Sequence, residues 1–178
     1  MDNAVVILTS VAAMNVDSYN RSFKATTDIQ NGAVFKCGTL STAEGESEVF
    51  TAVTAGATDT GLYMAFTAED AIVTVGGQQY KFDLIDPRLY TNVAGKVFSG
   101  FRLMPGDRIT IAGGVTGTPD AYVVVNASGA LEYAKTAPTS GAYFTAIQNT
   151  YISVAGAGNG AIGGTQRLSA VELEVSAN

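Results

Sequence analysis

The sequence predicts an all-β fold, a compact β-barrel or β-sandwich with at most one or two short helices. Runs rich in Val, Ile, Thr, Tyr and Phe recur between Gly, Asn, Asp and Pro residues, which is the pattern of strands and turns. The segment Asn92–Ile111 shows it most clearly, with apolar residues around Phe98, a Pro-Gly-Asp turn, and an alternation of Ile109 and Ile111. Long amphipathic helical patterns are missing.

The same pattern predicts strands along the whole chain. In order they are Val5–Val11, Ala33–Leu40, Glu48–Thr54, Leu62–Phe66, Ile72–Val75, Gln79–Leu84, Val97–Leu103, Arg108–Ile111, Tyr122–Val125, Leu131–Lys135, Ala142–Gln148, Tyr151–Val154 and Leu168–Val175.

Some of these predictions have a specific physical basis. Gly76-Gly77 separates two β-rich runs, and Gly-Gly supplies the positive φ of a two-residue hairpin turn. Residues Val171–Val175 alternate apolar side chains with Glu, so one face of that strand is buried and the other meets water. Asp86 as a cap before Pro87 makes residues 86–90 the best place for a helical turn, and Thr136–Gly141 is typical of a loop.

The length of 178 residues favours one domain, or a domain with a small extension. We expect residues 1–30 to form an N-terminal arm or first strand. Residues 31–178 then form a single β domain, with room for a C-terminal strand group from about residue 142.

Charge limits the classes of partner. The net charge is −6, so a phosphate backbone would be repelled, and we expect no nucleic-acid partner. Charged residues make up 15% of the chain against a typical value of about 25%, which fits either a surface covered by partners or one solvated by Thr, Ser, Asn and Gly.

The apolar N-terminal stretch does not resemble a targeting or membrane segment. No run reaches about 18 consecutive apolar residues, so we expect no membrane span. Asp2 stands where a signal peptide carries positive charge, and a first strand or a docking arm fits better.

Composition removes several common catalytic arrangements. The chain has no His, which removes the Ser-His-Asp and Cys-His arrangements and the usual zinc and iron sites. Cys37 is alone and sits in an apolar run, so a buried, inert thiol is favoured over a reactive one. We therefore expect no enzyme activity, no metal and no cofactor.

Three patterns that suggest chemistry have simpler explanations. Gly158–Gly163 fits G-x-G-x-x-G, but the residues after it predict a strand where a dinucleotide site needs a helix. Asp83 and Asp86 are a candidate acid pair for glycoside hydrolysis, but a strand end and a turn cap explain them better. Residues 44–48, with three Glu around Gly45, lack the pattern of a calcium loop and are typical of a solvated acidic turn.

Two longer segments resemble a known family. In Asn31–Thr54, Asn31-Gly32 opens a strand, Gly38-Thr39-Leu40 makes an apolar-Gly-apolar step, and Gly45-Glu46 makes a turn. In Asp86–Ile111, Ala94-Gly95-Lys96 precedes the strand Phe101-Arg102-Leu103, the turn Gly106-Asp107 and the apolar Ile109. With the closing-strand pattern of the C-terminus, they resemble the small capsid decoration, or cement, proteins of tailed bacteriophages.

The resemblance implies a β-tulip-like fold and a structural role in the virion. Such a protein binds the exterior of the icosahedral capsid, after its synthesis in the bacterial host cytoplasm, and stabilises the shell. Its partners would be the major capsid protein and further copies of itself, with a homotrimer favoured. Val5, Val6, Ile7 and Leu8 are candidates for capsid binding by strand addition, although a buried first strand also explains them.

Two other functions stay open. An acidic all-β chain also suits another virion component, such as a tail-tube, baseplate or fibre protein. A carbohydrate-binding module or glycosidase that uses Asp83 and Asp86 is a more remote alternative.

Overall fold

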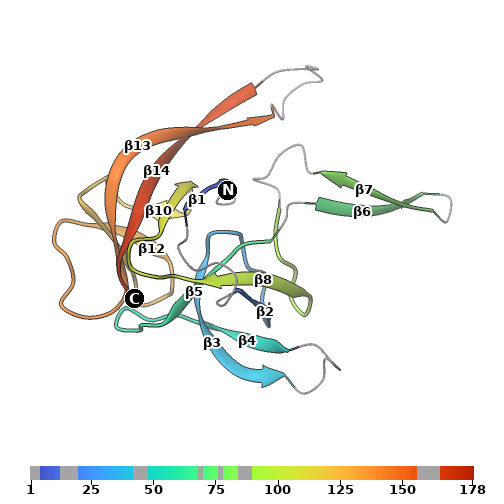
Figure 1. Ribbon diagram of the computed structural model, residues 1–178, viewed down its shortest axis with the longest axis horizontal. Coiled ribbons are helices and arrows are strands. Elements are labelled where there is room, and N and C mark those ends of the chain that lie inside the picture. Colours follow the sequence, from blue (N-terminus) through green and yellow to red (C-terminus); the bar gives the residue numbers. More distant parts are fainter. Residues whose placement is uncertain are drawn as a thin grey trace.

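Strands account for all the regular secondary structure that the computed structural model describes (Figure 1). The described residues are 5–12, 20–41, 48–67, 70–75, 78–83, 90–155 and 165–178. The strands are β1 (Val5–Ala12), β2 (Asn20–Lys24), β3 (Val34–Ser41), β4 (Val49–Thr54), β5 (Leu62–Ala65), β6 (Asp70–Val75), β7 (Gln78–Asp83), β8 (Val97–Arg102), β9 (Arg108–Ala112), β10 (Val115–Thr116), β11 (Tyr122–Val125), β12 (Leu131–Ala134), β13 (Tyr143–Ala155) and β14 (Thr165–Ala177). No helix in these residues has the length and apolar character needed to cross a membrane.

Five strands form a closed barrel in the order β2-β4-β3-β5-β8. The barrel closes because β2 pairs with strands on both of its sides. Strand β2 runs parallel to β4, with Phe23 opposite Phe50. It runs antiparallel to β8, with Phe23 opposite Phe98. Closure leaves no exposed edge in this part of the molecule.

The other large sheet has seven strands in the order β1-β9-β14-β13-β11-β12-β10. The C-terminal strand β14 lies between β9 and β13 in the middle of the sheet. Strands β13 and β14 form a long antiparallel hairpin that curves along one side of the molecule (Figure 1). Strands β6 and β7 pair only with each other among the described strands and project from the body (Figure 1).

The barrel is filled by an aromatic cluster around Phe23. The Phe23 ring is fully buried and meets Phe35 and Tyr63 edge to face, with centroid distances of 4.7 and 5.1 Å. Phe98 lies 6.0 Å from Phe23 and 5.6 Å from Phe35. Aromatic pairs at these separations add to the free energy gained from burial alone.

A second core joins the barrel to the seven-stranded sheet. Barrel residues Leu62 and Met64, with Leu103 after β8, meet sheet residues such as Phe144 and Leu173 in one cluster of buried side chains. The C-terminal residue reinforces this junction, because the Asn178 carboxamide accepts a hydrogen bond from the Leu62 N–H at 2.7 Å and donates one to the Leu62 carbonyl at 3.0 Å.

Strand β5 is buried on both faces. Tyr63 and Ala65 belong to the aromatic cluster, and Leu62 and Met64 point into the shared core. Its unbroken apolar sequence follows from this position, since neither face meets water.

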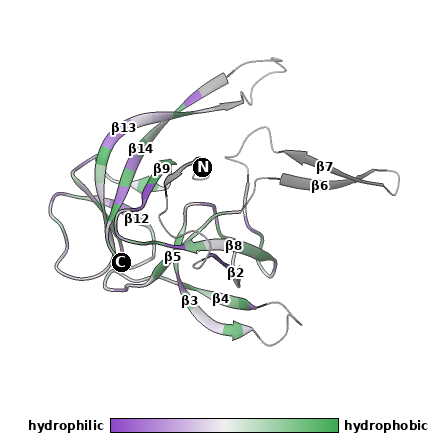
Figure 2. Cartoon of the chain, in the orientation of Figure 1, coloured by the Kyte–Doolittle hydropathy of each residue, from purple (hydrophilic) through white to green (hydrophobic). Residues whose placement is uncertain are grey.

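The sequence pattern predicted most strands within two residues of their observed ends. Val75 pairs with Gln78, so the predicted hairpin is confirmed, while Gly76-Gly77 lies outside the described residues. The alternation in β14 is confirmed too, because Val171, Leu173 and Val175 are buried while Glu172 and Glu174 are partly exposed. Hydrophilic and hydrophobic colours alternate along this strand (Figure 2).

Two features differ from expectation, and a third prediction is not tested. The two strands predicted at 142–148 and 151–154 are one strand, β13, with an irregularity between Ala146 and Gln148. Strands β2 and β10 were not predicted. The helical turn predicted at residues 86–90 falls largely on residues outside the described part of the chain.

Residues 1–30, expected to be an arm or a first strand, contribute β1 to the edge of the seven-stranded sheet and β2 to the barrel. Short polar β2 is therefore essential to barrel closure, although its sequence gives only a weak strand signal.

Gly100 offers a direct test of packing in the barrel. A Cβ added there would lie 2.9 Å from Phe35 Cζ and 3.1 Å from Phe23 Cδ2, so the Phe35 ring would have to shift and the Phe23 ring to move by a few tenths of an ångström. Because both rings are confined by other aromatic side chains, we expect Gly100→Ala to lower the free energy of unfolding by about 1–3 kcal/mol. Urea denaturation measures this. The control is Ser99→Ala at the exposed neighbouring position, and an equal effect of the two substitutions would contradict the packing explanation.

Candidate functional site

The acidic residues are dispersed, and the described part of the chain holds no group of three or more His, Cys, Asp and Glu residues that could bind a metal. Asp107 is 1% exposed, and its carboxylate accepts a hydrogen bond from the Met104 N–H at 2.9 Å. It stabilises the turn between β8 and β9, a structural role that explains its burial.

The other candidate acids do not form a described site. Asp83 ends β7, opposite Asp70 in the strand register, and Asp86 lies outside the described residues. Glu44 and Glu46 lie outside them as well, while Glu48 is exposed before β4.

The glycine motif at 158–163 also lies outside the described residues, but the segment after it is described. The chain continues as strand β14 from Thr165. A dinucleotide site needs a helix N-terminus at this place, so the strand removes the basis for that interpretation.

Cys37 was expected to be buried, and the structure shows it only partly buried at the margin of the aromatic cluster. Arg21 Nη1 donates a hydrogen bond to its sulfur at 3.7 Å. The guanidinium of Arg21 also lies 4.7 Å from the Phe50 ring centroid, so it covers the aromatic cluster from outside. These contacts give the cysteine and the arginine a role in sealing the barrel.

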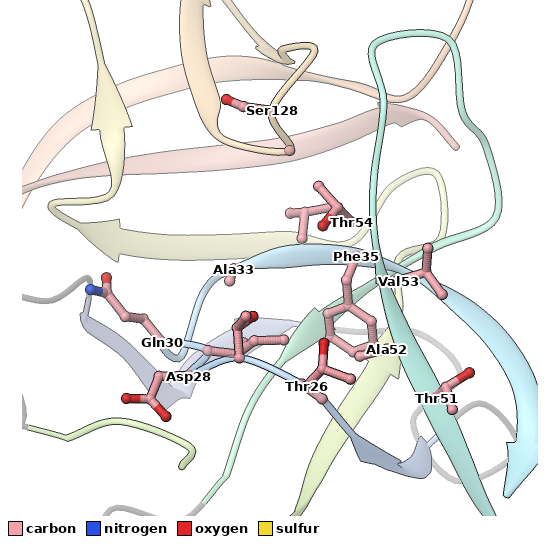
Figure 3. Close-up of a pocket in the computed structure, with 15 residues that line it drawn as sticks. Thr26, Asp28, Gln30, Ala33, Phe35, Thr51, Ala52, Val53, Thr54 and Ser128 are labelled. Atoms are coloured by element: carbon pink, nitrogen blue, oxygen red, sulfur yellow. The ribbon is translucent and has the colours of Figure 1, made fainter. Parts of the chain in front are cut away.

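An open hollow of about 590 Å³ lies beside the barrel, between the chain before β3, strand β4 and the turn after β11 (Figure 3). Its described lining is mainly Thr, Ser and small apolar residues, and Asp28 is the one charged residue among them. The Asp28 carboxylate accepts a hydrogen bond from the Ala94 N–H at 2.8 Å. The hollow provides hydroxyl groups for neutral polar contacts but no acid and base pair for hydrolysis. Sequence reasoning missed it because its walls come from segments far apart in the chain.

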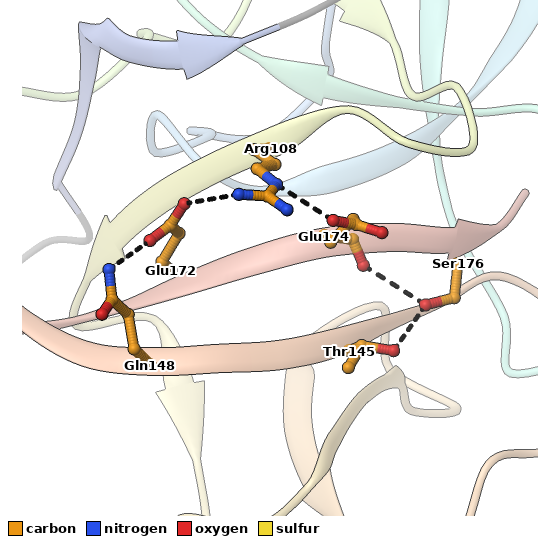
Figure 4. A network of polar contacts seen from close by, with 6 residues as sticks. All are labelled: Arg108, Thr145, Gln148, Glu172, Glu174 and Ser176. Atoms are coloured by element: carbon orange, nitrogen blue, oxygen red, sulfur yellow. Dashed lines mark hydrogen bonds and ion pairs between the residues drawn. The ribbon is translucent and has the colours of Figure 1, made fainter.

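The outer face of the seven-stranded sheet carries a polar network (Figure 4). Arg108 on β9 lies 2.9 Å from a Glu174 oxygen and 3.8 Å from a Glu172 oxygen on β14. Gln148 on β13 donates to Glu172 at 2.7 Å. Exposed ion pairs of this kind contribute at most about 1 kcal/mol each, and the network is better explained as cross-strand pairing than as a binding site.

The far part of β13 presents an open strand edge. Strand β11 pairs with β13 only over Tyr143–Thr145, and the Ala146 N–H donates to the Ala121 carbonyl at 2.9 Å. From Ile147 to Ala155, β14 is the one pairing partner of β13 among the described strands. Ile147 is 41% exposed and Tyr151 is 52% exposed.

The proposed capsid-binding residues Val5, Val6, Ile7 and Leu8 lie in β1, where Val5 pairs with Ala112 and Val6 with Ile111. The Val6 side chain is 2% exposed and belongs to the shared core. The other three side chains are outside the described part of the structure, so attachment through this segment stays a prediction.

Comparisons with protein-family models, with curated proteins and with solved structures found no match to this chain. The family resemblance therefore stays a prediction from the sequence.

Asp59 makes stability depend on pH. Its carboxylate accepts a hydrogen bond from the Gly56 N–H at 2.6 Å and lies 3.1 Å from Lys36 Nζ. The Gly56 hydrogen bond first, and then Lys36, hold the pKa of this carboxyl below its ordinary value of 3.8. The stabilisation is fully present above pH 3.8 and is lost as pH falls through the lower pKa of the folded state.

We therefore expect Asp59→Asn to lower the melting temperature at neutral pH and to make it fall less steeply below pH 3.8 than in the wild type. Thermal unfolding followed by circular dichroism over an acidic pH series measures this. Glu48→Gln removes the same charge at an exposed position and serves as the control. Parallel pH profiles for wild type and Asp59→Asn would reject the assignment.

Proposed function

We propose that this protein is a decoration protein that binds the outer surface of a tailed-phage icosahedral capsid and stabilises the shell. It has no reaction of its own in this proposal. Its partners are the major capsid protein and further copies of itself, for which the family resemblance implies a trimer.

The observation that carries the proposal is that the two segments with family resemblance meet in one structural unit. Segment 31–54 forms β3 and β4, and segment 86–111 includes β8, so together they supply three of the five barrel strands. The two segments also contact each other directly, because Asn92 Nδ2 donates a hydrogen bond to Asn31 Oδ1 at 3.1 Å. The two segments that carry these motifs therefore lie together in the fold, although they are separated in the sequence.

The motif residues have definite roles in that body. Asn31 is 1% exposed, and its carboxamide bonds the Thr67 N–H at 3.1 Å and the Thr67 carbonyl at 2.9 Å. Gly95 and Gly106 have φ values of 73° and 93°, which side chains other than glycine rarely adopt. Asn31, Gly95 and Gly106, which help to carry the resemblance, thus shape the barrel and its connections, while Gly45-Glu46 lies outside the described residues.

The stiffness and the sparse charge of this protein suit a role in stabilising a capsid from its outer surface. A closed barrel sharing a core with a second sheet is stiff, and the sparse charge leaves surface that can contact neighbouring subunits. Many copies on one particle raise the effective concentration of every contact, so each contact needs only modest affinity. Binding to the expanded shell stabilises that state by mass action.

The proposal predicts that the purified protein binds intact expanded shells prepared without it, from the phage that encodes this chain. Binding should be saturable, and the temperature at which shells break should rise with occupancy. Cosedimentation and a thermal disruption assay measure the two effects, with an unexpanded shell as the control. Absence of binding to intact expanded shells, or electron-microscopy density that places the chain in the tail, would reject the proposal.

The role of β1 in attachment needs substitutions that leave the core residue Val6 in place. Because Val6 is a core residue, deleting the segment would disturb the fold as well as any docking surface. We expect Val5→Thr with Ile7→Thr to reduce shell occupancy at a fixed protein concentration, since Thr keeps strand propensity and loses apolar contact. Unchanged occupancy with unchanged thermal stability would exclude attachment through these two side chains.

A further inference from the structure

We propose that the open edge of β13, from Ile147 to Ala155, pairs with the same edge of a second copy of this chain. The two strands run antiparallel about a twofold axis and join the seven-stranded sheets of both copies. This inference concerns self-association and does not depend on capsid binding.

The first observation is the length of unpaired edge. Beyond the hydrogen bond from Ala146 to Ala121, no other described strand pairs with this side of β13. Every second residue along the edge therefore points its N–H and C=O groups outward. Such an edge is a template for another strand.

The second observation is that residues 147–155 lack two of the features that usually protect edge strands, charge and proline, while the irregularity between Ala146 and Gln148 lies at one end of them. Natural edge strands carry charged residues or proline, or are very short, and Ile147–Ala155 contains neither a charge nor a proline. Strand β10, which lies at one end of the seven-stranded sheet, is protected by its shortness, because it spans only Val115–Thr116. The open edge of β14 at Thr165–Ser169 is also short and carries Arg167, so β13 offers the most accessible pairing site of that hairpin.

The exposed face of the edge supplies side chains for cross-strand contact. Tyr151 is 52% exposed, and the Arg167 guanidinium lies 4.2 Å from its ring centroid. Asn149 and Ser153 are exposed on the same face, two residues to either side of Tyr151. Pairing over the whole edge places its midpoint, Tyr151, on the twofold axis and sets Asn149 opposite Ser153 of the second copy.

Charge favours a second copy in the antiparallel direction. The chain carries a net charge of −6, so most surfaces of two copies repel, whereas residues 147–155 carry no charge of their own. The charged residues near the two ends of this edge differ in sign. Asp120 shares a hollow with Ile147 and Gln148 at one end, and Arg167 pairs with Ser153 near the other. Antiparallel pairing brings the acidic end of each copy towards the basic end of the other.

The proposed pairing joins a limited number of copies, and its affinity is low. Each copy uses its β13 edge once, so this contact by itself joins two copies, and it is separate from the contacts of the trimer that the family resemblance implies. Two strand edges bury less surface than a standard stable interface of about 1,600 Å², so the dimer forms at high protein concentration. On a crowded surface the same contact would link neighbouring copies.

The test uses two charge variants of the full chain. Asn149→Glu with Ser153→Glu places like charges opposite each other across the twofold axis, and so does Asn149→Lys with Ser153→Lys. We expect wild type to approach a dimer with rising concentration in sedimentation equilibrium, and each variant to dissociate about tenfold more readily. An equimolar mixture of the two variants should recover dimerisation, because opposite charges then face each other.

The control is Thr136→Glu with Ser140→Glu, which adds the same charge to an exposed loop away from the edge. Thermal unfolding of all variants verifies that the fold is intact. A wild type that stays monomeric to near-millimolar concentration would overturn the proposal. So would a trimer unaffected by the edge variants, or a mixture of acidic and basic variants that associates no better than either alone.

Discussion

The architecture depends on the burial of β5 on both of its faces. Tyr63 and Ala65 close the aromatic cluster of the barrel, while Leu62 and Met64 enter the core shared with the seven-stranded sheet. Both cores contain side chains of this strand, and the two sheets are thereby coupled. The Asn178 carboxamide binds the Leu62 backbone, so the end of the chain also holds β5 in place. A structural change in the barrel is expected to affect the seven-stranded sheet through the densely packed core that the two share.

This coupling makes the body stiff and confines the available pairing surface to its periphery. The closed barrel has no open strand edge, and β14 occupies the middle of the seven-stranded sheet. The far part of the β13–β14 hairpin stays open, because it extends beyond β9 and β11. The described polar clusters are explained by turns and cross-strand pairs, such as Asp107 and the Arg108 network. The open edge at the end of this hairpin is the feature on which the inferred self-association depends.

The alternation of side chains made most strands predictable. In β14 the pattern of Val171, Leu173 and Val175 specified both the strand and its buried face. Strand β2 escaped prediction because Asn20–Lys24 is short and mostly polar, with Phe23 as its one large apolar residue. The predicted break within β13 was wrong because Asn149 and Thr150, which resemble a turn in isolation, are held in extended conformation by pairing with Val171 and Ala170 of β14.

Local periodicity, turn glycines and the lack of histidine are properties of neighbouring residues or of composition, so the amino-acid order was enough to predict an all-β chain. Which strands pair, how the barrel closes through β2 and β4, and where β13 loses its neighbour depend on contacts between residues far apart in the chain. Many strand orders satisfy the same alternation, and only packing of the two cores selects one of them. The hollow beside the barrel and the open edge are consequences of that selection, and no short sequence pattern encodes either one.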